Sequence, residues 1–424
     1  MPKSIKHALE KILPAPLLRA LLASYHLSLA YLGALLYGFP SRKLRIIAVT
    51  GTKGKSSTTE LLNSIFEESG EKTALLNSIR IKVADSSQPN EMRISMPGRF
   101  FIQRLLARAL REGCTTAILE MTSEGARQYR HRGIELDALV FTNLAPEHIE
   151  SHGSYEAYAD AKFEIGLSLA RSVKRPRVVV ANADDAQSAR YLALPVEASL
   201  PFSLSANAPF SADESGGYFT FDGMKIMTRL PGIFSLQNAL AAAMLARAFG
   251  IATEKIAGGI RKLEQIPGRA ERIEAGQDFA VVVDYAHTPE SLAALYDAYG
   301  SKRKICVLGS TGGGRDTWKR PVMGGIADSR CDEVILTNED PYDEDPRAIA
   351  EQLAKGMKHA PQIIMDRREA IRAAISRAKT DDAVLITGKG TDPCICVENG
   401  KKIPWSDAQV AREELQKLLS VKRV

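Results

Sequence analysis

From residue 45 onward, short runs of apolar and β-branched residues alternate with stretches of helical periodicity. The runs are LRIIAVT, TTAILE, DALVFTN and RVVVAN in the first part of the chain, then FAVVVDY, KICVLGS, EVILTN, QIIMD and AVLITG. Strands that alternate with helices build βαβ units, whose strands pair in parallel. The sequence therefore predicts an α/β fold with mostly parallel sheets.

The 424 residues exceed the size at which one hydrophobic core keeps growing, so several domains are expected. Between the two strand series, YFTFDGMKIMTRL carries an Asp-Gly hairpin signal and LQNALAAAMLARAFG is an apolar helix ending at glycine. IPGRAERIE then opens the second series, which places a boundary near Pro267 and Gly268. We predict a short apolar helical segment over 1–44 and two α/β domains over 45–267 and 268–424.

Charge and cysteine content narrow the function classes. The 56 basic and 50 acidic residues are dispersed and give a net charge of +6, which suits small anionic substrates better than nucleic acid. The five cysteines have no C-x-x-C spacing, so neither a zinc ribbon nor a disulfide framework is indicated. We therefore expect a cytoplasmic protein with no nucleic-acid partner.

The segment 20–38, ALLASYHLSLAYLGALLYG, contains no formally charged residue over 19 positions. That length reaches the lower limit for crossing a bilayer, although polar and small residues dilute the segment. Three interpretations stay open: a helix packed on the protein, a helix on a membrane surface, and a membrane span. Residues 14–39 are thus a candidate for peripheral membrane contact.

Residues 46–70, IIAVTGTKGKSSTTELLNSIFEESG, lead from a strand through a glycine-rich loop into a helix. A P-loop reads G-x-x-x-x-G-K-[ST], and Gly54, Lys55 and Ser56 fit its second half. The first glycine's place is taken by Val49, while Gly51 stands nearer. Because the loop opens a helix, its N–H groups favour an anion, although an ordinary glycine-rich βα turn is the alternative.

A loop that binds a nucleotide needs ligands for the accompanying magnesium ion. These ligands are expected at the ends of the neighbouring strands. TTAILEMTSEG places Glu120 at the end of a buried strand, and the segment after the next strand contains His148, His152 and Lys162. A carboxylate in that position suits a metal or a bound water. Taken singly, each histidine or lysine is also compatible with a loop cap or a solvated helix face.

Nine segments together resemble the Mur ligases, most closely the MurE type, over roughly residues 45 to 400. They are VTGTKGKSSTT, LEMTSEGARQYR, TNLAPEHIESHGSYEAYADAK, GIFSLQNALAA, IPGRAERI, VDYAHTPESL, GGGRDTWKRPVM, TNEDPYDEDP and LITGKGTD. The resemblance implies an ATP-dependent ligase of peptidoglycan precursor synthesis, with a mostly parallel-sheet P-loop ATPase domain over 45–267 and a Rossmann-like α/β domain over 268–424. Such an enzyme phosphorylates a muramoyl-dipeptide-type carboxylate to an acyl phosphate, which an amino acid then attacks to release phosphate.

The resemblance also implies roles for individual residues. Lys55, Lys162 and His148 would be catalytic, with two Mg²⁺ ions held by Ser56, Glu120, His148 and Lys162, the last as a carbamate. The residues implied for ATP are Gly51, Thr52, Lys53, Gly54, Lys55, Ser56, Ser57, Asn238, Arg269 and Asp284. Those implied for the acceptor and the amino acid are Thr122, Ser123, Gln128, Arg130, Arg315, Asp340, Tyr342, Gly388 and Asp392.

The chain departs from the family pattern in its acceptor and amino-acid segments. Tyr342 stands where members that take meso-diaminopimelate have an arginine for the distal carboxylate, and Thr391 and Asp392 replace a His-Glu pair. We therefore expect lysine, or another amino acid without a distal carboxylate, rather than diaminopimelate. Glu124 replaces a usual histidine, which bears on how the acceptor is oriented.

The region before the P-loop strand is also shorter than in the family. About 45 residues stand where members carry a UDP-binding domain of about a hundred, so either a reduced precursor site or a carrier substrate near a membrane is expected. The rival interpretations are a folylpolyglutamate synthetase-like ligase, the ligase subunit of the lipid II amidotransferase, and an ATP-binding protein without catalysis. The lack of a four-cysteine ribbon argues against the second. We expect a monomer with small-molecule partners.

Overall fold

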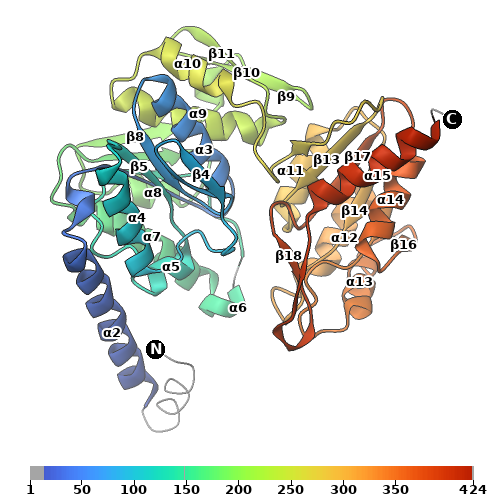
Figure 1. Cartoon of the computed structure of the whole chain (residues 1–424), viewed down its shortest axis with the longest axis horizontal. Coiled ribbons are helices and arrows are strands. Elements are labelled where there is room, and N and C mark those ends of the chain that lie inside the picture. The colour runs from blue at the N-terminus through green and yellow to red at the C-terminus, as the bar shows by residue number, and fades with distance from the viewer. Residues whose placement is uncertain (1–13, 148, 423–424) are drawn as a thin grey trace.

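The computed structural model describes residues 14–147 and 149–422, which form two α/β units and an N-terminal helix (Figure 1). The first unit is built on an eight-stranded sheet in which most neighbours are parallel. Across the sheet its strands are β4 (Ser86–Pro89), β3 (Arg80–Val83), β2 (Thr73–Leu76), β5 (Thr116–Glu120), β1 (Arg45–Thr50), β6 (Ala138–Phe141), β7 (Val178–Asn182) and β8 (Ala198–Phe202).

Helices cover both faces of this sheet, as β1 illustrates. Ile47 and Val49 point into one apolar core and Ile46 and Ala48 into the other, because successive strand residues face opposite sides. The first core is closed by α3 (Lys55–Glu68), α9 (Ile233–Ala248) and α10 (Thr253–Lys262). The second contains residues of α4 (Arg99–Arg111), α5 (Ser123–Arg127), α7 (Tyr155–Arg171) and α8 (Ser188–Leu192), while α6 (Ile149–His152) precedes α7.

A small antiparallel sheet lies at the edge of the first unit. It consists of β9 (Ser211–Asp213), β10 (Gly216–Phe221) and β11 (Met224–Thr228). Asp222 and Gly223, at φ 48° and 74°, make the turn between the last two strands. Positive φ at both central residues is what a tight hairpin with a right-handed twist requires, so the Asp-Gly prediction is confirmed.

The second unit is built on a six-stranded sheet of mixed direction at one edge. Its strands, in spatial order, are β12 (Glu271–Arg272), β13 (Ala280–Asp284), β17 (Ala383–Thr387), β14 (Lys304–Leu308), β15 (Glu333–Leu336) and β16 (Gln362–Ile363). One face is covered by α11 (Pro289–Ala298), α12 (Lys319–Arg330) and α13 (Pro346–Ala354), the other by α14 (Arg367–Arg377) and α15 (Asp407–Lys422). A hairpin is formed by β18 (Cys394–Cys396) and β19 (Lys402–Pro404), and single 3₁₀ turns span Pro40–Arg42, Ser205–Asn207 and Glu398–Gly400.

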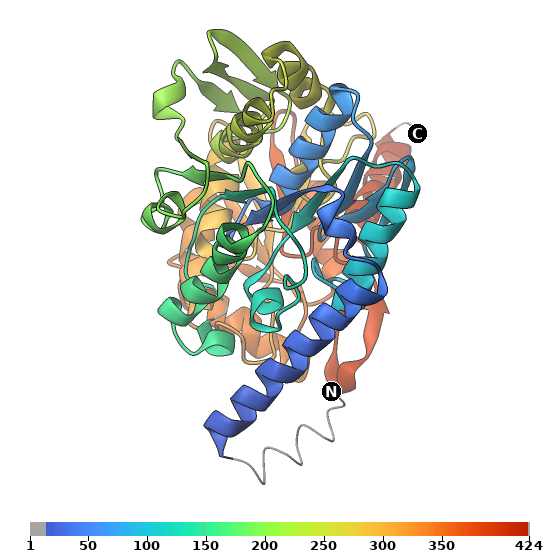
Figure 2. The same cartoon turned by 90° about the vertical axis from the view of Figure 1, so that its left-hand side faces the viewer.

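The N-terminal helix α2 (Ala15–Leu36) packs through its small residues and exposes its large ones. Ala30 and Ala34 are fully buried, and a Cβ built on Gly133 would come within 3.0 Å of the Ala34 Cβ. Leu35 and Leu36 are 63% and 66% exposed. The N-terminal end of α2 extends away from both sheets (Figures 1 and 2). In the described part of the chain, no helix combines the length and apolar character that a bilayer span requires.

The cysteine prediction needs one correction. Cys306 in β14 and Cys331, directly after α12, form a disulfide across 25 residues of sequence. The spacing rules did not detect it, because the two residues meet only through the crossover from β14 to β15. Cys114, Cys394 and Cys396 are buried free thiols. The predicted α/β fold with mostly parallel sheets is confirmed.

Candidate active site

The loop between β1 and α3 requires glycine at two positions. Gly51 has φ +147°, and a Cβ there would lie 2.0 Å from the Thr142 Oγ1; Gly54 has φ +80°, and a Cβ there would lie 2.2 Å from the Asn238 Oδ1. Only glycine combines these dihedrals with such close approach. Val49, by contrast, is a buried residue of β1, two positions before the loop turns. The glycine absent from the general P-loop pattern would therefore fall inside the strand.

The loop is fixed by contacts with the end of β6 and with α7. Thr52 N donates to the Asn143 carbonyl at 2.8 Å, and its hydroxyl lies 3.0 Å from the Tyr158 hydroxyl. Lys53 Nζ pairs with Glu147 at 3.1 Å, and burial lowers the pKa of Lys53. Lys55 Nζ donates to the Thr52 carbonyl at 2.8 Å. Ser57 follows in the first turn of α3, so Lys53 and Lys55 lie at a helix N-terminus, whose free N–H groups favour an anion.

Glu120 ends β5, directly beside Val49 of β1 in the parallel register. It is 3% exposed, and its carboxylate accepts from Ser56 Oγ at 2.7 Å, Ser95 Oγ at 2.7 Å and Ser78 N at 3.1 Å. Hydroxyl and carboxylate oxygens are ligands that Mg²⁺ takes, and it commonly completes its shell with water and phosphate. Ser56 and Glu120 thus fit a magnesium site. Sequence reasoning found both but missed Ser78 and Ser95, because neither stands in a recognisable motif.

Lys162 of α7 reaches the underside of the same loop. Its side chain is 2% exposed, its Nζ donates to the Gly51 carbonyl at 2.6 Å, and it lies 4.8 Å from the Tyr158 ring centre. Burial, together with nearby Lys55, holds the pKa of Lys162 well below its usual value. His152 of α6 packs edge-on against Tyr158. His148 lies outside the described residues. Over residues 14–147 and 149–422, no cluster of three or more His, Cys, Asp or Glu side chains has metal-binding geometry.

The residues expected near the nucleoside lie on both units. Asn238 of α9 is 7% exposed, borders Gly54 and accepts from Thr58 Oγ1 at 3.3 Å. Arg269 stacks over Tyr285 at 4.6 Å and donates to Ser78 Oγ at 3.3 Å, which brings the second unit to the loop. Asp284 accepts from the backbone N–H groups of Ala270 and Ala286 at 2.6 Å each, and burial raises its pKa. Each carboxylate oxygen thus accepts one backbone N–H near the strand end and keeps a second acceptor site for a ligand hydroxyl.

The expected acceptor residues surround α5. Thr122 caps this helix by accepting from Gly125 N at 3.2 Å, and Ser123 is buried in its first turn. Gln128 bridges Glu124 and Arg130 with hydrogen bonds of 2.7 Å on each side. Arg130 also donates to the Met96 carbonyl. Thr122, Gln128 and Arg130 are linked by hydrogen bonds, in part through Met96, and form the expected acceptor surface next to the loop that carries Ser95.

The expected amino-acid residues gather at the carboxyl ends of β14, β15 and β17. Arg315 stacks on the Tyr342 ring at 4.9 Å, and Asp340 pairs with Lys389 at 2.8 Å. Gly388 has φ +107°, and a Cβ on it would lie 2.2 Å from Glu339 Oε2. Ligands of open α/β sheets bind in the crevice at such strand ends.

Sequence reasoning missed Glu339, which is 3% exposed. Its Oε1 accepts from Thr311 at 2.7 Å, while its Oε2 has no hydrogen-bond partner among the described residues. Burial raises the pKa of Glu339. Its place in the quoted EDPY segment was the only signal that could have drawn attention to it.

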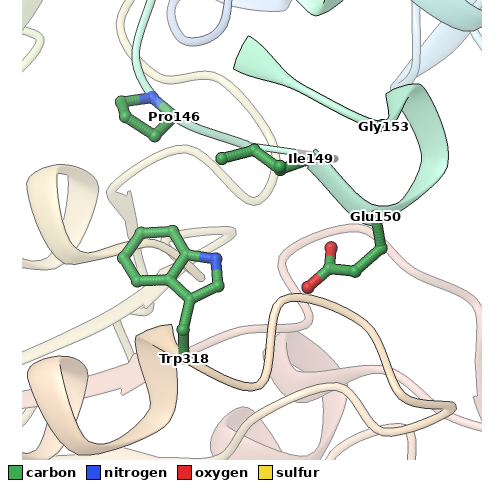
Figure 3. A pocket seen from close by; sticks show the side chains of 5 residues that line it. All are labelled: Pro146, Ile149, Glu150, Gly153 and Trp318. Carbon is green, nitrogen blue, oxygen red and sulfur yellow. The ribbon is translucent and has the colours of Figure 1, made fainter.

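Further contacts, and a pocket, lie between the two units. His287 of the second unit lies 2.8 Å from Glu147 of the first, and burial with Lys53 nearby lowers the pKa of His287 to about 4. Arg93 of the first unit pairs with Asp340 at 2.8 Å and with Asp392. A pocket of about 580 Å³ opens between Trp318 and the segment preceding α7 (Figure 3). It is lined by Pro146, Ile149, Glu150, Gly153 and Trp318.

Comparison with known proteins places these features in one family. A model of the Mur ligase middle domain matches residues 49–246, and a model of the Mur ligase glutamate ligase domain matches residues 268–390. The chain is 35% identical to the UDP-N-acetylmuramoyl-L-alanyl-D-glutamate–2,6-diaminopimelate ligase of Syntrophomonas wolfei, over 92% of this chain and 82% of that protein. It is 36% identical to the UDP-N-acetylmuramyl-tripeptide synthetase of a Roseiflexus species, over 96% of this chain and 84% of that protein.

Solved structures agree. A structure of a UDP-N-acetylmuramoyl-L-alanyl-D-glutamate–2,6-diaminopimelate ligase superposes with a TM-score of 0.60 at 28% identity, covering 89% of this chain and 79% of the other. A Mycobacterium tuberculosis folylpolyglutamate synthase superposes with a TM-score of 0.69 at 19% identity, over 92% and 96% of the two chains, which shows a shared fold. The resemblance predicted from the ordered motifs is confirmed, and the chain belongs to the Mur ligase family.

Proposed function

We propose that this chain is a MurE-type ligase that uses ATP to join an amino acid to a muramoyl-dipeptide-type carboxylate. The observation that carries the proposal is the convergence of the P-loop, the Ser56–Glu120 pair and Lys162 at one end of the parallel sheet. The relatives, which are named as a 2,6-diaminopimelate ligase and a UDP-N-acetylmuramyl-tripeptide synthetase, support the same reaction class. The divisions near residues 44 and 267 then separate an N-terminal segment, an ATP-binding domain and a closing domain.

The chemistry proceeds in two steps. A carboxylate oxygen of the acceptor attacks the γ-phosphorus of ATP, which forms an acyl phosphate and releases ADP. The neutral amine of the amino acid then attacks the acyl carbon, and the amide forms as phosphate leaves and the amine nitrogen loses one proton. A carboxylate is a poor electrophile, and phosphorylation makes its carbon reactive by adding a leaving group. A closed, dry site protects the acyl phosphate from hydrolysis. Lys55 would meet the transferring phosphoryl group, where positioning and charge neutralisation provide most of the catalysis.

The fit of Ser56 and Glu120 to magnesium supports one Mg²⁺ site, and His148 with a carbamate on Lys162 would hold a second. Bound Mg²⁺ supplies charge neutralisation at the phosphates. The Lys162 side chain is buried, so an ammonium group there has no shell of solvent water. Its Nζ lies against the loop that would hold the phosphates. Thr52, Lys53 and Ser57 would contact phosphate; Asn238, Arg269 and Asp284 would contact the nucleoside.

For the acceptor, Thr122, Gln128 and Arg130 offer hydroxyl, amide and guanidinium groups, and Ser123 lies buried beside Thr122. For the amino acid, Arg315 is exposed on the loop before α12 and suits an α-carboxylate. Tyr342 brings no positive charge to a distal carboxylate. We therefore propose lysine, or another amino acid without a distal carboxylate, over diaminopimelate.

The direct experiment incubates purified protein with ATP, Mg²⁺, a UDP-muramoyl dipeptide and a panel of amino acids. The expected result is ADP release that requires both acceptor and amino acid, and a product whose mass equals their sum minus water. ADP release with folate and glutamate, and not with the muramoyl dipeptide, would instead indicate a folylpolyglutamate synthetase-like reaction. Addition of diaminopimelate with lysine ignored would refute the amino-acid proposal while keeping the ligase.

We further propose that α2 contacts an anionic membrane surface on an otherwise cytoplasmic monomer. Its exposed face carries Tyr31, Leu32, Leu35 and Leu36, whereas the face packed on the protein is the less bulky one. The sequence has no Asp or Glu from residue 11 to residue 59, and Arg104 and Arg111 of neighbouring α4 are exposed. Apolar side chains with positive charges around them suit acidic lipid headgroups.

Co-sedimentation with phosphatidylcholine vesicles, with and without phosphatidylglycerol, tests this contact. We expect binding only to the acidic vesicles, and its loss in a Leu35→Ser/Leu36→Ser variant. Val173→Ser is the control, because Val173 is 70% exposed on another part of the surface. Equal recovery of all proteins in the supernatant, or a dimer in light scattering that the double variant breaks, would refute it.

A further inference from the structure

Arg93 reaches from the first unit into the amino-acid end of the second. Its side chain is 18% exposed, and its Nη2 pairs with Asp340 at 2.8 Å and with Asp392. Its Nη1 lies 2.8 Å from Cys396 Sγ and 3.4 Å from Cys394 Sγ. The guanidinium thus donates to groups of the other unit. The two carboxylates are 247 and 299 residues away from Arg93 in the sequence.

The backbone that presents Arg93 is held in a tight turn. Arg93 has φ +57°, in the left-handed region that arginine rarely adopts. Asn90 fixes the turn: its Nδ2 donates to the carbonyls of Asn77 at 2.7 Å and Ile94 at 3.1 Å, and its Oδ1 accepts from Met92 N at 3.2 Å. A costly conformation persists only where the surroundings impose it, so the direction of this side chain is built into the loop.

The same short loop touches the two other parts of the site. Ser95 Oγ donates to Glu120 at 2.7 Å, on the metal side. Met96 accepts from Arg130 through its carbonyl and from Thr122 N through its sulfur at 3.3 Å, on the acceptor side. Residues 93–96 therefore connect the magnesium candidates, the acceptor surface and the amino-acid end within four positions.

Charge explains why the contact matters. Asp340 and Asp392 are 4% and 15% exposed at their side chains, and in the second unit Lys389 pairs with both. Arg93 supplies the other cation that balances two carboxylates. A buried carboxylate left without a counter-charge is expensive, so the second unit gains its partner only when it closes on the first.

We propose that Arg93 is a positioning residue that holds the second unit closed over the acceptor and couples occupation of the acceptor side to the amino-acid end. The closing role stands on this structure alone, whereas the identity of the two ligands rests on the function proposed above. Arg93 acts through Asp340 and Asp392 and not by touching the reacting atoms.

Trp318 provides a native reporter of closure. It lies on the second unit and faces Pro146 and Ile149 of the first across the pocket (Figure 3), and Trp405 is the only other tryptophan in the sequence. In a Trp405→Phe background, acrylamide quenching therefore measures how accessible Trp318 is. We expect Arg93→Met to raise the quenching constant about twofold, Arg93→Lys to give an intermediate value, and Arg108→Met to leave it unchanged. Arg108 is the control because it pairs with Glu112, the residue directly after α4, and so contacts only the first unit.

Asp392→Asn tests the contact from the other side. It should raise quenching as Arg93→Met does, and the double variant should add little, since residues of one contact are not additive. Circular dichroism and thermal melting identify any variant that fails to fold, and the Asp392 variant then decides. Quenching equal to wild type in both folded single variants would overturn the proposal.

A kinetic arm separates positioning from selectivity. Arg93→Met should raise the KM for the amino acid about tenfold or more, the size expected for a lost charged hydrogen bond, with the KM for ATP within about twofold. The ratio of kcat/KM between lysine and neutral amino acids should stay constant. A shift of that ratio toward lysine with unchanged quenching would make Arg93 a selectivity residue and overturn the closing role. Wild-type protein that closes but ligates nothing would refute the proposed function alone.

Discussion

At the scale of residues, the loop around Gly54 depends on space as much as on charge. Gly54 and Gly70 both have positive φ, at +80° and +94°, at the two ends of α3. A Cβ on Gly54 would collide with Asn238, while a Cβ on Gly70 would meet nothing within 4 Å. Both positions therefore have a backbone conformation that would strain an alanine, but only Gly54 has a neighbour that an added Cβ would meet. This makes them a matched pair for substitution.

Gly54→Ala should weaken ATP binding by about tenfold or more, because the loop must move away from Asn238 and loses an oriented N–H group for phosphate. Gly70→Ala should cost about 1 kcal/mol of unfolding free energy, the penalty of the left-handed conformation, and leave ATP affinity unchanged. Isothermal titration with a non-hydrolysable ATP analogue and chemical denaturation measure the two quantities. Equal affinities in both variants would contradict this interpretation of the loop.

At the scale of elements, strands and long helices could be predicted because their residues carry a period. β1, β5, β6 and β7 follow the apolar runs, and the Asp222–Gly223 turn follows turn chemistry. The edge strands β3 and β4 were not found, because a segment such as SSQP has no apolar period and pairs only through its neighbour. The same limit applies to site residues: Ser56 and Glu120 stand in motifs, whereas Ser78, Ser95, Arg93 and Glu339 are placed only by the fold.

Helix α2 packs against the protein through small residues and exposes its large apolar ones, which is the reverse of the usual helix pattern. Its docking depends on close approach of Ala30 and Ala34 to the backbone near Gly133, so bulk at these positions must displace the helix. We expect Ala34→Leu to release α2 and to speed tryptic cleavage near Arg42 and Lys43, which intact-mass spectrometry would detect. Leu35→Ala, at an exposed position, is the control and should leave cleavage unchanged. Unaltered cleavage of the Ala34 variant would show that α2 is not held by this contact.

At the scale of the whole molecule, closure is sensitive to acid through His287. Its pKa is lowered to about 4 in the closed form, and an exposed histidine has a pKa near 6.5, so the closed form binds fewer protons. Closure is therefore fully favoured above about pH 6.5 and is lost as pH falls toward 4. The open fraction should rise by up to about tenfold per pH unit in this window.

Trp318 quenching between pH 7 and 4.5 measures this effect in the Trp405→Phe background. We expect accessibility to rise as the pH falls, and a His287→Gln variant to show a flatter profile because it has no proton to gain. Protein concentration and ionic strength stay fixed, and near-ultraviolet circular dichroism confirms that the units remain folded. Parallel profiles for both proteins would exclude His287 as the group responsible.

In the proposed reaction, the site converts a carboxylate into an acyl phosphate. Isotope transfer tests it most directly: an acceptor whose reacting carboxylate carries ¹⁸O at both oxygens is turned over with ATP and the preferred amino acid. We expect one ¹⁸O to leave in inorganic phosphate and the other to stay in the new amide, as mass spectrometry of both products would show. Unlabelled phosphate, or ¹⁸O appearing in AMP, would contradict it.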